Sequence, residues 1–198
     1  MNLPNKITTF RMVCVVIIDF ILLFPWAACG VNMPMVFGHI DLHYFISAIL
    51  FLIASFSDFL DGYLARKYNL VTTYGKFMDP IADKLLVDTV VIIMAIQRPD
   101  LVPPVVAVIM IARDLLVDAL RQVASSKGIV LAANIWGKLK TVIQMVALTF
   151  VLLLDWPFAL LKLPIAITTI ICYLAGVVSL LSGVLYFTKN LKVFNDKK

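Results

Sequence analysis

Six long apolar stretches occupy most of this chain, and they constrain its fold more than any other feature. They cover residues 9–28, 39–66, 75–97, 101–124, 135–154 and 164–187. Each has roughly the 20 residues that an α-helix needs to cross the hydrocarbon core of a bilayer. Prolines, glycines and polar residues separate the stretches. The sequence therefore predicts an all-α integral membrane protein with six transmembrane helices.

The composition supports lipid as the surrounding solvent. Of the 198 residues, 62% are hydrophobic and only 15% are charged, whereas a soluble domain has about 25% charged residues. A soluble fold of this length could not bury so much apolar surface. The net charge of +5 forms no basic stripe of the kind that binds nucleic acid. Cys14, Cys29 and Cys172 show neither metal-site spacing nor a disulfide framework.

The connections between the stretches are short, and no repeat or linker divides the chain. We therefore expect one domain over residues 1–198, in which consecutive helices are antiparallel neighbours. The first apolar stretch has no small-residue cleavage site followed by a soluble domain, so we expect it to remain as a membrane span.

The basic residues predict the orientation, because six spans place both termini on the same side. That side carries Lys6, Arg11, Arg66, Lys67, Lys76, Lys84, Arg113, Arg121, Lys127, Lys138, Lys140, Lys189, Lys192, Lys197 and Lys198. The opposite side carries only Arg98 and Lys162. Since basic residues collect on the cytoplasmic side, both termini are expected there. The short chain without a targeting segment favours a bacterial cytoplasmic (plasma) membrane.

Four aspartates interrupt two of the apolar stretches. Asp58 and Asp61 lie near the cytoplasmic end of the second predicted helix, and Asp79 and Asp83 near that of the third. Their i,i+3 and i,i+4 spacings place each pair on one helix face. At about 1.5 Å of rise per residue, both pairs lie roughly 6 to 12 Å from the helix ends. In an antiparallel hairpin, all four carboxylates would reach one volume in the cytoplasmic third of the membrane.

Such a cluster predicts a metal site. A carboxylate in a spanning helix costs about 2.5 to 3.5 kcal/mol, and two unit charges about 4 Å apart repel by roughly 4 kcal/mol at an effective dielectric of 20. One or two hard divalent ions, Mg²⁺ or Mn²⁺, would relieve this repulsion. One alternative is that the aspartates cap helix ends or pair with Arg66, Lys76 and Lys84. Another is a cation transporter, which predicts acids spread through the bilayer depth.

Small and basic residues accompany the acids. Gly62 and Ala65 would let a bulky ligand approach the helix backbone, although close helix packing is an equally simple explanation. Arg66 offers a guanidinium fork suited to a phosphate. Gly75 leaves room at the start of the third predicted helix.

These residues resemble the signature of the CDP-alcohol phosphotransferases, in which DxxDGxxAR is followed after eight residues by GxxxDxxxD. Every defined position is filled, at Asp58, Asp61, Gly62, Ala65, Arg66, Gly75, Asp79 and Asp83. The motif covers residues 58–83, and the six-helix layout resembles the family throughout the chain. The family often forms homodimers, so the resemblance also implies a homodimer.

The resemblance implies a role for each matching residue. Asp58, Asp61 and Asp79 would be the main metal ligands, and Asp83 would complete the metal site and act as the base on the acceptor hydroxyl. The pocket for the cytidine and pyrophosphate would be formed by Asp61, Gly62, Ala65, Arg66 and Gly75.

The family's first helix often begins with an Asn-x-x-Thr element, which Asn5 and Thr8 match here. The resemblance implies that these two residues contact the nucleotide. For Asn5 alone, a helix N-cap is the simpler alternative.

Three further stretches are similar to family members that make phosphatidylglycerophosphate. They are Asp-Pro-Ile-Ala-Asp-Lys-Leu-Leu at residues 79–86, Ala-Arg-Asp-Leu at 112–115 and Gly-Lys-Leu-Lys-Thr at 137–141. The similarity implies that a phosphatidyl group passes from CDP-diacylglycerol to glycerol 3-phosphate, with CMP as the second product. Inositol phosphate or phosphatidylglycerol is the alternative acceptor within the family.

A phosphorylated acceptor needs a cationic site. The cytoplasmic halves of the fourth and fifth predicted helices supply Arg113, Arg121, Lys138 and Lys140. We expect these four residues to bind the acceptor phosphate. An ion pair with Asp114 or Asp118 is the alternative for the two arginines. Lys127 and the lysines near the C-terminus are expected to meet anionic lipid headgroups.

Overall fold

The computed structural model describes residues 3–67, 72–129, 131 and 135–191, with the backbone alone for residues 3, 4, 59, 61–67, 73 and 76. Within this part of the chain the α-helices are α1 (Leu3–Leu23), α2 (Leu42–Lys67), α3 (Thr73–Gln97), α4 (Pro104–Ser126), α5 (Ile135–Leu152) and α6 (Ile167–Asn190). An antiparallel pair of short strands, β1 (Met35–Val36) and β2 (Ile40–Asp41), lies between α1 and α2, and the 3₁₀ helix η1 (Phe158–Leu161) precedes α6. The prediction of six helices is confirmed.

The first helix begins earlier than its apolar stretch. α1 starts at Leu3, so Asn5 and Thr8 lie inside the helix and the N-cap alternative for Asn5 is wrong. The apolar pattern missed this first part because it carries polar side chains that face protein: Asn5 is 8% exposed and Thr8 is 1% exposed. α1 ends at Leu23, just before Phe24, because a residue that precedes proline disfavours the helical conformation.

Local signals define other helix starts. The Thr72 Oγ1 caps α3 by accepting a hydrogen bond of 3.0 Å from the Gly75 N–H. α4 begins with Pro104, at a position where the missing N–H would have no partner within the helix.

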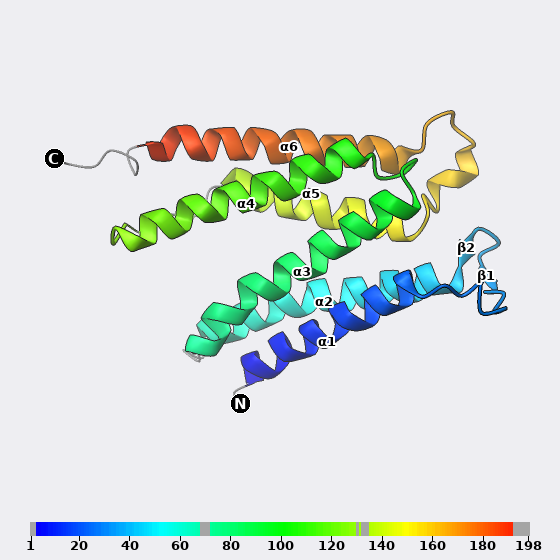
Figure 1. Cartoon of the computed structure of the whole chain (residues 1–198), viewed down its shortest axis with the longest axis horizontal. Coiled ribbons are helices and arrows are strands. Elements are labelled where there is room, and N and C mark those ends of the chain that lie inside the picture. The colour runs from blue at the N-terminus through cyan, green and yellow to red at the C-terminus, as the bar shows by residue number, and fades with distance from the viewer. Residues whose placement is uncertain (1–2, 68–71, 130, 132–134, 192–198) are drawn as a thin grey trace.

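The helices form two groups of three (Figure 1). α1 packs along both α2 and α3, and α6 packs along both α4 and α5. α2 and α3 contact each other far less than either contacts α1. The expectation that consecutive helices are close neighbours holds for α1 with α2 and for α5 with α6, and it is wrong for α2 with α3, for α3 with α4 and for α4 with α5. Helices this apolar can pack on several faces, so chain order does not decide their neighbours.

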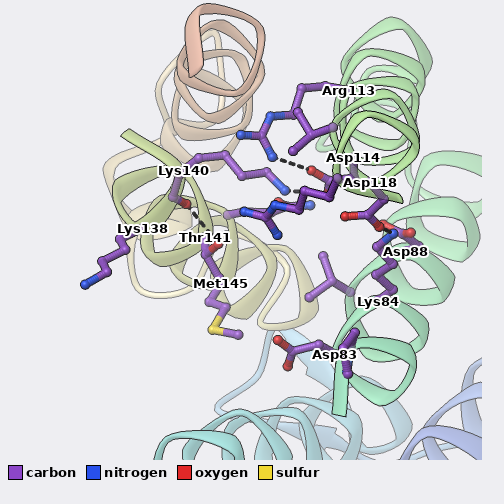
Figure 2. Close-up of a pocket in the computed structure, with 16 residues that line it drawn as sticks. Asp83, Lys84, Asp88, Arg113, Asp114, Asp118, Lys138, Lys140, Thr141 and Met145 are labelled. Atoms are coloured by element: carbon purple, nitrogen blue, oxygen red, sulfur yellow. Dashed lines mark hydrogen bonds and ion pairs between the residues drawn. The ribbon is translucent and has the colours of Figure 1, made fainter. Parts of the chain in front are cut away.

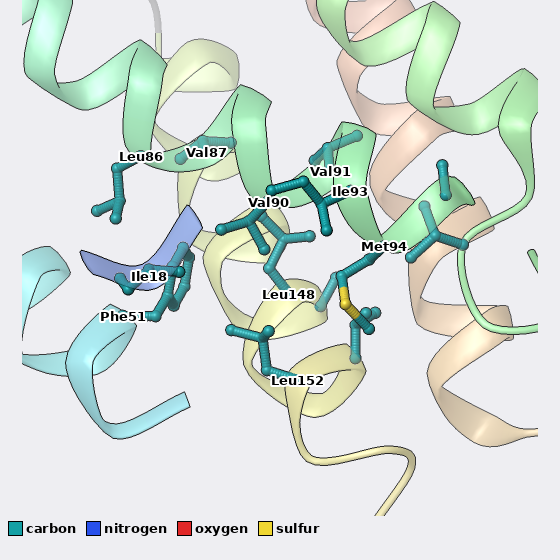
Figure 3. Packing of buried hydrophobic residues seen from close by; sticks show 14 of the residues in the cluster. Ile18, Phe51, Leu86, Val87, Val90, Val91, Ile93, Met94, Leu148 and Leu152 are labelled. Atoms are coloured by element: carbon teal, nitrogen blue, oxygen red, sulfur yellow. The ribbon is translucent and has the colours of Figure 1, made fainter. Parts of the chain in front are cut away.

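One apolar core joins the two groups (Figure 3). Its buried side chains include Ile18 of α1, Phe51 of α2, Leu86, Val90 and Met94 of α3, and Leu148 and Leu152 of α5. α3 contacts α4 and α5 as well as α1 and α2, so it links the two halves.

The outer surface is also strongly apolar. Large exposed side chains occur on every helix, among them Val16 (67% exposed), Phe56 (62%), Ile96 (75%), Val108 (65%), Val142 (59%) and Leu174 (53%). Monomeric soluble proteins rarely expose contiguous apolar surface of this extent. Within the described part of the chain, α5 and α6 are long and apolar enough to cross a membrane by length and composition.

The predicted metal-binding and substrate-binding residues lie toward one end of the molecule. α1, α3 and α5 begin there, and α2, α4 and α6 end there (Figure 1). The strand pair and η1 lie at the opposite end.

Candidate active site

Arg11 of α1 brings two of the predicted metal-binding aspartates together. Its Nη1 lies 2.6 Å from the Asp58 Oδ1 on α2 and 3.2 Å from the Asp83 Oδ1 on α3. The Arg11 side chain is 0% exposed, whereas those of Asp58 and Asp83 are 31% and 40% exposed. Because both carboxylate oxygens share one nitrogen, they converge on one small volume. Asp58 of α2 and Asp83 of α3 therefore reach one volume through Arg11 of α1, which packs against both helices.

Asp79 joins this site through α1. The Thr8 Oγ1 donates a hydrogen bond of 2.7 Å to the Asp79 Oδ1, and the Thr72 Oγ1 donates one of 2.7 Å to the Asn5 Oδ1. Asn5, Thr8 and Arg11 are spaced three residues apart, which places them on one face of α1. We call Arg11, Asp58, Asp79 and Asp83 the carboxylate cluster.

Gly75 is buried where α1 meets the start of α3. A Cβ atom at this position would lie 3.3 Å from the Thr72 Oγ1, 3.4 Å from the Asn5 Oδ1 and 3.6 Å from the Asp79 Oδ2. Protein side chains therefore fill the room that the sequence predicts beside Gly75. The glycine allows Asn5 to approach the first turn of α3.

The other predicted residues of the motif are Asp61, Gly62, Ala65 and Arg66, whose side chains lie outside the described residues. The backbone of α2 continues as a helix through all four positions, to Lys67. Among the described side chains alone, no three His, Cys, Asp or Glu residues form a group that could hold a metal ion. The four-aspartate metal site therefore stays a prediction.

A cavity of about 300 Å³ opens beside the carboxylate cluster (Figure 2). It is bounded by α3, α4 and α5, and Asp83 belongs to both the cluster and the cavity wall. All four residues predicted to bind the acceptor phosphate line it: Arg113, Arg121, Lys138 and Lys140. We call it the basic cavity.

Asp114 holds two of these cations. Its Oδ1 accepts a hydrogen bond of 2.9 Å from the Arg113 Nη1, and its Oδ2 accepts one of 2.5 Å from the Lys140 Nζ. The ion-pair alternative is therefore confirmed for Arg113. The Arg113 Nη2 also donates to the Ser182 Oγ at 2.7 Å. Five cations and four aspartates line the cavity in all, so a small excess of positive charge remains there.

The remaining charged residues of the cavity have different surroundings. Lys84 of α3 pairs with Asp118 of α4. Arg121 donates its Nε–H to the Tyr186 hydroxyl oxygen at 3.3 Å, and its guanidinium carbon lies 5.4 Å from the centre of that ring. Among the described residues, Arg121 thus contacts Tyr186 of α6, and the alternative of an ion pair with Asp114 or Asp118 is not observed for it. Lys138 is exposed.

Sequence reasoning missed the central position of Arg11. A signal was present, because Arg11 extends the three-residue spacing of Asn5 and Thr8 by one more step. It also missed the contacts of Ser182 and Tyr186 with the two arginines. No sequence signal predicted these, because they depend on how α6 packs against α4.

The chain matches the family model described as CDP-alcohol phosphatidyltransferase over residues 1–181. The chain belongs to the CDP-alcohol phosphatidyltransferase family. The matched range contains the whole carboxylate cluster and every residue that lines the basic cavity. The resemblance carried by the DxxDGxxAR motif is confirmed.

Members of this family with curated names are similar to the chain over nearly its full length. A CDP-diacylglycerol–glycerol-3-phosphate 3-phosphatidyltransferase of Bacillus subtilis (strain 168) is 42% identical over 191 residues, which cover 96% of this chain and 95% of that protein. A protein with the same name from Rickettsia bellii (strain RML369-C) is 37% identical over 193 residues, which cover 98% of this chain and 97% of that protein. The one from Rickettsia typhi (strain ATCC VR-144 / Wilmington) is 37% identical over 186 residues, 94% of this chain and 95% of that protein.

Proposed function

We propose that this chain transfers a phosphatidyl group from CDP-diacylglycerol to glycerol 3-phosphate, forming phosphatidylglycerophosphate and CMP. The observation that carries the proposal is the position of Asp83, which contacts Arg11 in the carboxylate cluster and also lines the basic cavity. We infer that this one carboxylate serves both the site proposed for the activated lipid and the site proposed for the phosphorylated acceptor. The names of the similar family members support the same reaction.

We assign a divalent ion, Mg²⁺ or Mn²⁺ and one or two in number, to Asp58, Asp61, Asp79 and Asp83. The residues present fit such an ion, because carboxylate oxygens are the ligands that hard cations prefer. Asp58 and Asp83 also converge on a single cationic group, which indicates a place suited to positive charge. When bound, the ion would neutralise the negative charge that develops on the leaving CMP.

Asp83 is assigned as the general base. Its carboxylate takes the proton from the sn-1 hydroxyl of glycerol 3-phosphate. The hydroxyl oxygen then forms a bond to the phosphorus that carries the diacylglycerol, and the bond from this phosphorus to the CMP oxygen breaks. A side chain that is 40% exposed at the edge of the cavity is accessible to the acceptor. In phosphoryl transfers, positioning and electrostatics supply most of the catalysis.

The acceptor phosphate is assigned to Arg113, Arg121, Lys138 and Lys140. Asp114 orients Arg113 and Lys140 before the acceptor arrives, which reduces the side-chain entropy lost on binding. Arg113 also offers the planar fork that matches phosphate oxygens. An acceptor without a phosphate would not need this group of cations.

We assign the nucleotide end of the donor to the surface next to α1 and the C-terminal part of α2. The residues concerned are Asp61, Gly62, Ala65 and Arg66, together with Asn5, Thr8 and Gly75. The last three are buried in the contact between α1 and α3, so their proposed part is to hold α1 against the nucleotide site. Arg66 is expected to bind the pyrophosphate.

The six helices are proposed to be transmembrane, with both termini cytoplasmic, in a bacterial cytoplasmic membrane. Exposed apolar side chains on every helix support contact with membrane lipids. Basic residues gather at the end that carries the site, whereas Arg98 and Lys162 lie toward the other end. A homodimer is expected from the family resemblance, and the mass of the detergent-solubilised protein tests it.

The test of the reaction is CMP release by the purified protein with CDP-diacylglycerol and Mg²⁺. Separate assays contain glycerol 3-phosphate, inositol phosphate, phosphatidylglycerol or serine as the acceptor. We expect CMP release only in the assay that contains glycerol 3-phosphate as the acceptor. A chelator should abolish this release, and Mg²⁺ or Mn²⁺ should restore it. Release with a different acceptor would keep the family chemistry and overturn the assigned acceptor. If folded protein released CMP with none of them, the proposal would be wrong.

A further inference from the structure

The basic cavity contains two polar groups that the proposed reaction does not use. Asp88 of α3 and Gln144 of α5 both line this cavity. The Asp88 Oδ1 and the Gln144 Nε2 are buried, and neither has a hydrogen-bond partner among the described residues. Gln144 is only 2% exposed. Since buried polar groups in proteins are nearly always hydrogen-bonded, these two atoms are available to a polar group that enters the cavity.

Both groups lie one helical turn deeper than charged residues of the same cavity. Asp88 follows Lys84 by four residues on α3, and Gln144 follows Lys140 by four residues on α5. Four residues correspond to about 6 Å of rise. Both helices begin at the end of the molecule that carries the site, so both steps lead toward its middle (Figure 1). Figure 2 shows Asp88 beside Lys84 on α3. The wall of the cavity thus combines cations with an acceptor and a donor of hydrogen bonds, each one turn further along its helix than a lysine of the same wall.

We propose that Asp88 and Gln144 bind the hydroxyl group that neighbours the attacking hydroxyl of the acceptor. A hydroxyl donates one hydrogen bond and accepts others. The Asp88 carboxylate would accept its proton, and the Gln144 amide would donate to its oxygen. The two residues therefore determine specificity for a polyol phosphate with adjacent hydroxyls.

The spacing along α3 fits this assignment. Asp83, the proposed base, and Asp88 are five residues apart, which corresponds to about 7.5 Å of rise. Both residues line the cavity, so one acceptor could reach the two carboxylates through two adjacent hydroxyl groups. Glycerol 3-phosphate meets this requirement with its two hydroxyls, while its phosphate reaches the cations of the cavity. The inference rests on the proposed function and adds the recognition of the second hydroxyl.

The test compares two acceptors that differ only in this hydroxyl, glycerol 3-phosphate and 3-hydroxypropyl phosphate. The ratio of their kcat/KM values for CMP release is measured for the wild-type protein, Gln144→Leu and Asp88→Asn. A site that hydrogen-bonds a substrate hydroxyl strongly rejects the analogue that lacks it, so the wild-type protein is expected to prefer glycerol 3-phosphate by at least about 100-fold. Both variants are expected to reduce the preference to below about 10-fold, mainly by lowering kcat/KM for glycerol 3-phosphate.

Thr149→Val is the matched control. Thr149 also lies on α5, but its hydroxyl donates to the Met145 carbonyl oxygen of its own helix, so this variant is expected to keep the wild-type preference. A wild-type protein that uses both acceptors equally well would overturn the inference without any variant. So would variants that slow both acceptors by the same factor, because the residues would then be structural. Failure of CMP release with glycerol 3-phosphate itself would instead contradict the proposed function.

Discussion

Arg11 is the residue on which the carboxylate cluster depends. It is a buried cation in contact with two carboxylates, and in a fully buried pair the loss of one partner costs roughly 3–5 kcal/mol. Asp58 and Asp83 are partly exposed, so we expect a smaller loss for Arg11→Met. The variant removes this cation from the two carboxylates, so the stability of its folded state should depend more strongly on added divalent ions.

The measurement is the thermal midpoint in excess Mg²⁺ and in excess chelator. The midpoint of Arg11→Met is expected to fall markedly when Mg²⁺ is removed, and that of the wild-type protein to fall less because Arg11 still compensates the acids. Equal sensitivity of the two proteins to the chelator would show that Arg11 does not share this role.

Asp100 provides a pH-dependent contribution away from the site, in the connection between α3 and α4. The Arg98 guanidinium donates to both of its oxygens, at 3.0 and 2.7 Å, and this hydrogen-bonded pair lowers the pKa of Asp100 below its ordinary value. Because the pKa is lower in the folded state, ionised Asp100 contributes to stability above about pH 4. This contribution is lost as the pH falls through the folded-state pKa. The Asp100 side chain is 59% exposed, so the contribution is about 0.2–1 kcal/mol.

Asp100→Asn should therefore lower the thermal midpoint at pH 7 by no more than roughly 2–4 °C. This difference from the wild-type protein should shrink as the pH is lowered from 7 to 3, because the contribution fades as the pH falls toward the lowered folded-state pKa of Asp100. A difference of the same size at both pH values would contradict the assignment to ionised Asp100.

At the scale of helices, the contact between α4 and α6 positions Arg113. A Cβ atom at Gly183 of α6 would lie 2.8 Å from the Arg113 Cγ, closer than real Cβ atoms approach. Gly183→Ala should therefore displace Arg113 from Asp114 and Ser182. Since a hydrogen bond to a charged group contributes about 1.5–3 kcal/mol, the KM for glycerol 3-phosphate should rise at least about tenfold, with little change in the KM for CDP-diacylglycerol.

Gly176→Ala is the control on the same helix. Its Cβ would approach the Val106 Cγ1 at 3.1 Å, so this variant also strains the packing of α6 against α4 but does not touch the cavity. It should change the thermal midpoint and leave both KM values near those of the wild-type protein. Equal effects of the two variants on the acceptor KM would assign the change to general helix displacement.

The helices themselves were predictable, but their neighbours were not. Each helix follows from a run of apolar residues, and the spacing of Asp58, Asp79 and Asp83 predicted that α2 and α3 face one site. That spacing did not reveal α1 between them, because apolar helices offer similar faces to several partners. The position of Arg11 and the approach of Gly183 to Arg113 depend on residues distant in the sequence, so they required the three-dimensional structure.

For the whole molecule, the native cysteines test the proposed orientation. Cys29 is exposed and follows α1 at the end opposite the site, whereas Cys14 and Cys172 are buried. In sealed right-side-out membrane vesicles, a membrane-impermeant maleimide should label the protein at Cys29, and Cys29→Ser should abolish the labelling.

The cytoplasmic end is tested with Ser126→Cys in the Cys29→Ser protein, because Ser126 is exposed at the end of α4. Labelling of this cysteine is expected only after the vesicles are permeabilised. If it reacts in sealed right-side-out vesicles, the proposed orientation is wrong.

The central claim is that Asp83 joins the carboxylate cluster to the basic cavity and activates the acceptor. The most direct test is the rate at which purified Asp83→Asn transfers radiolabelled glycerol 3-phosphate into lipid, with saturating CDP-diacylglycerol and Mg²⁺. A general base contributes typically 10²–10⁴-fold, so the rate should fall by about 10³-fold while glycerol 3-phosphate still binds, and Asp100→Asn should retain the wild-type rate. If folded Asp83→Asn keeps more than about a tenth of the wild-type rate, it contradicts the assigned role of Asp83.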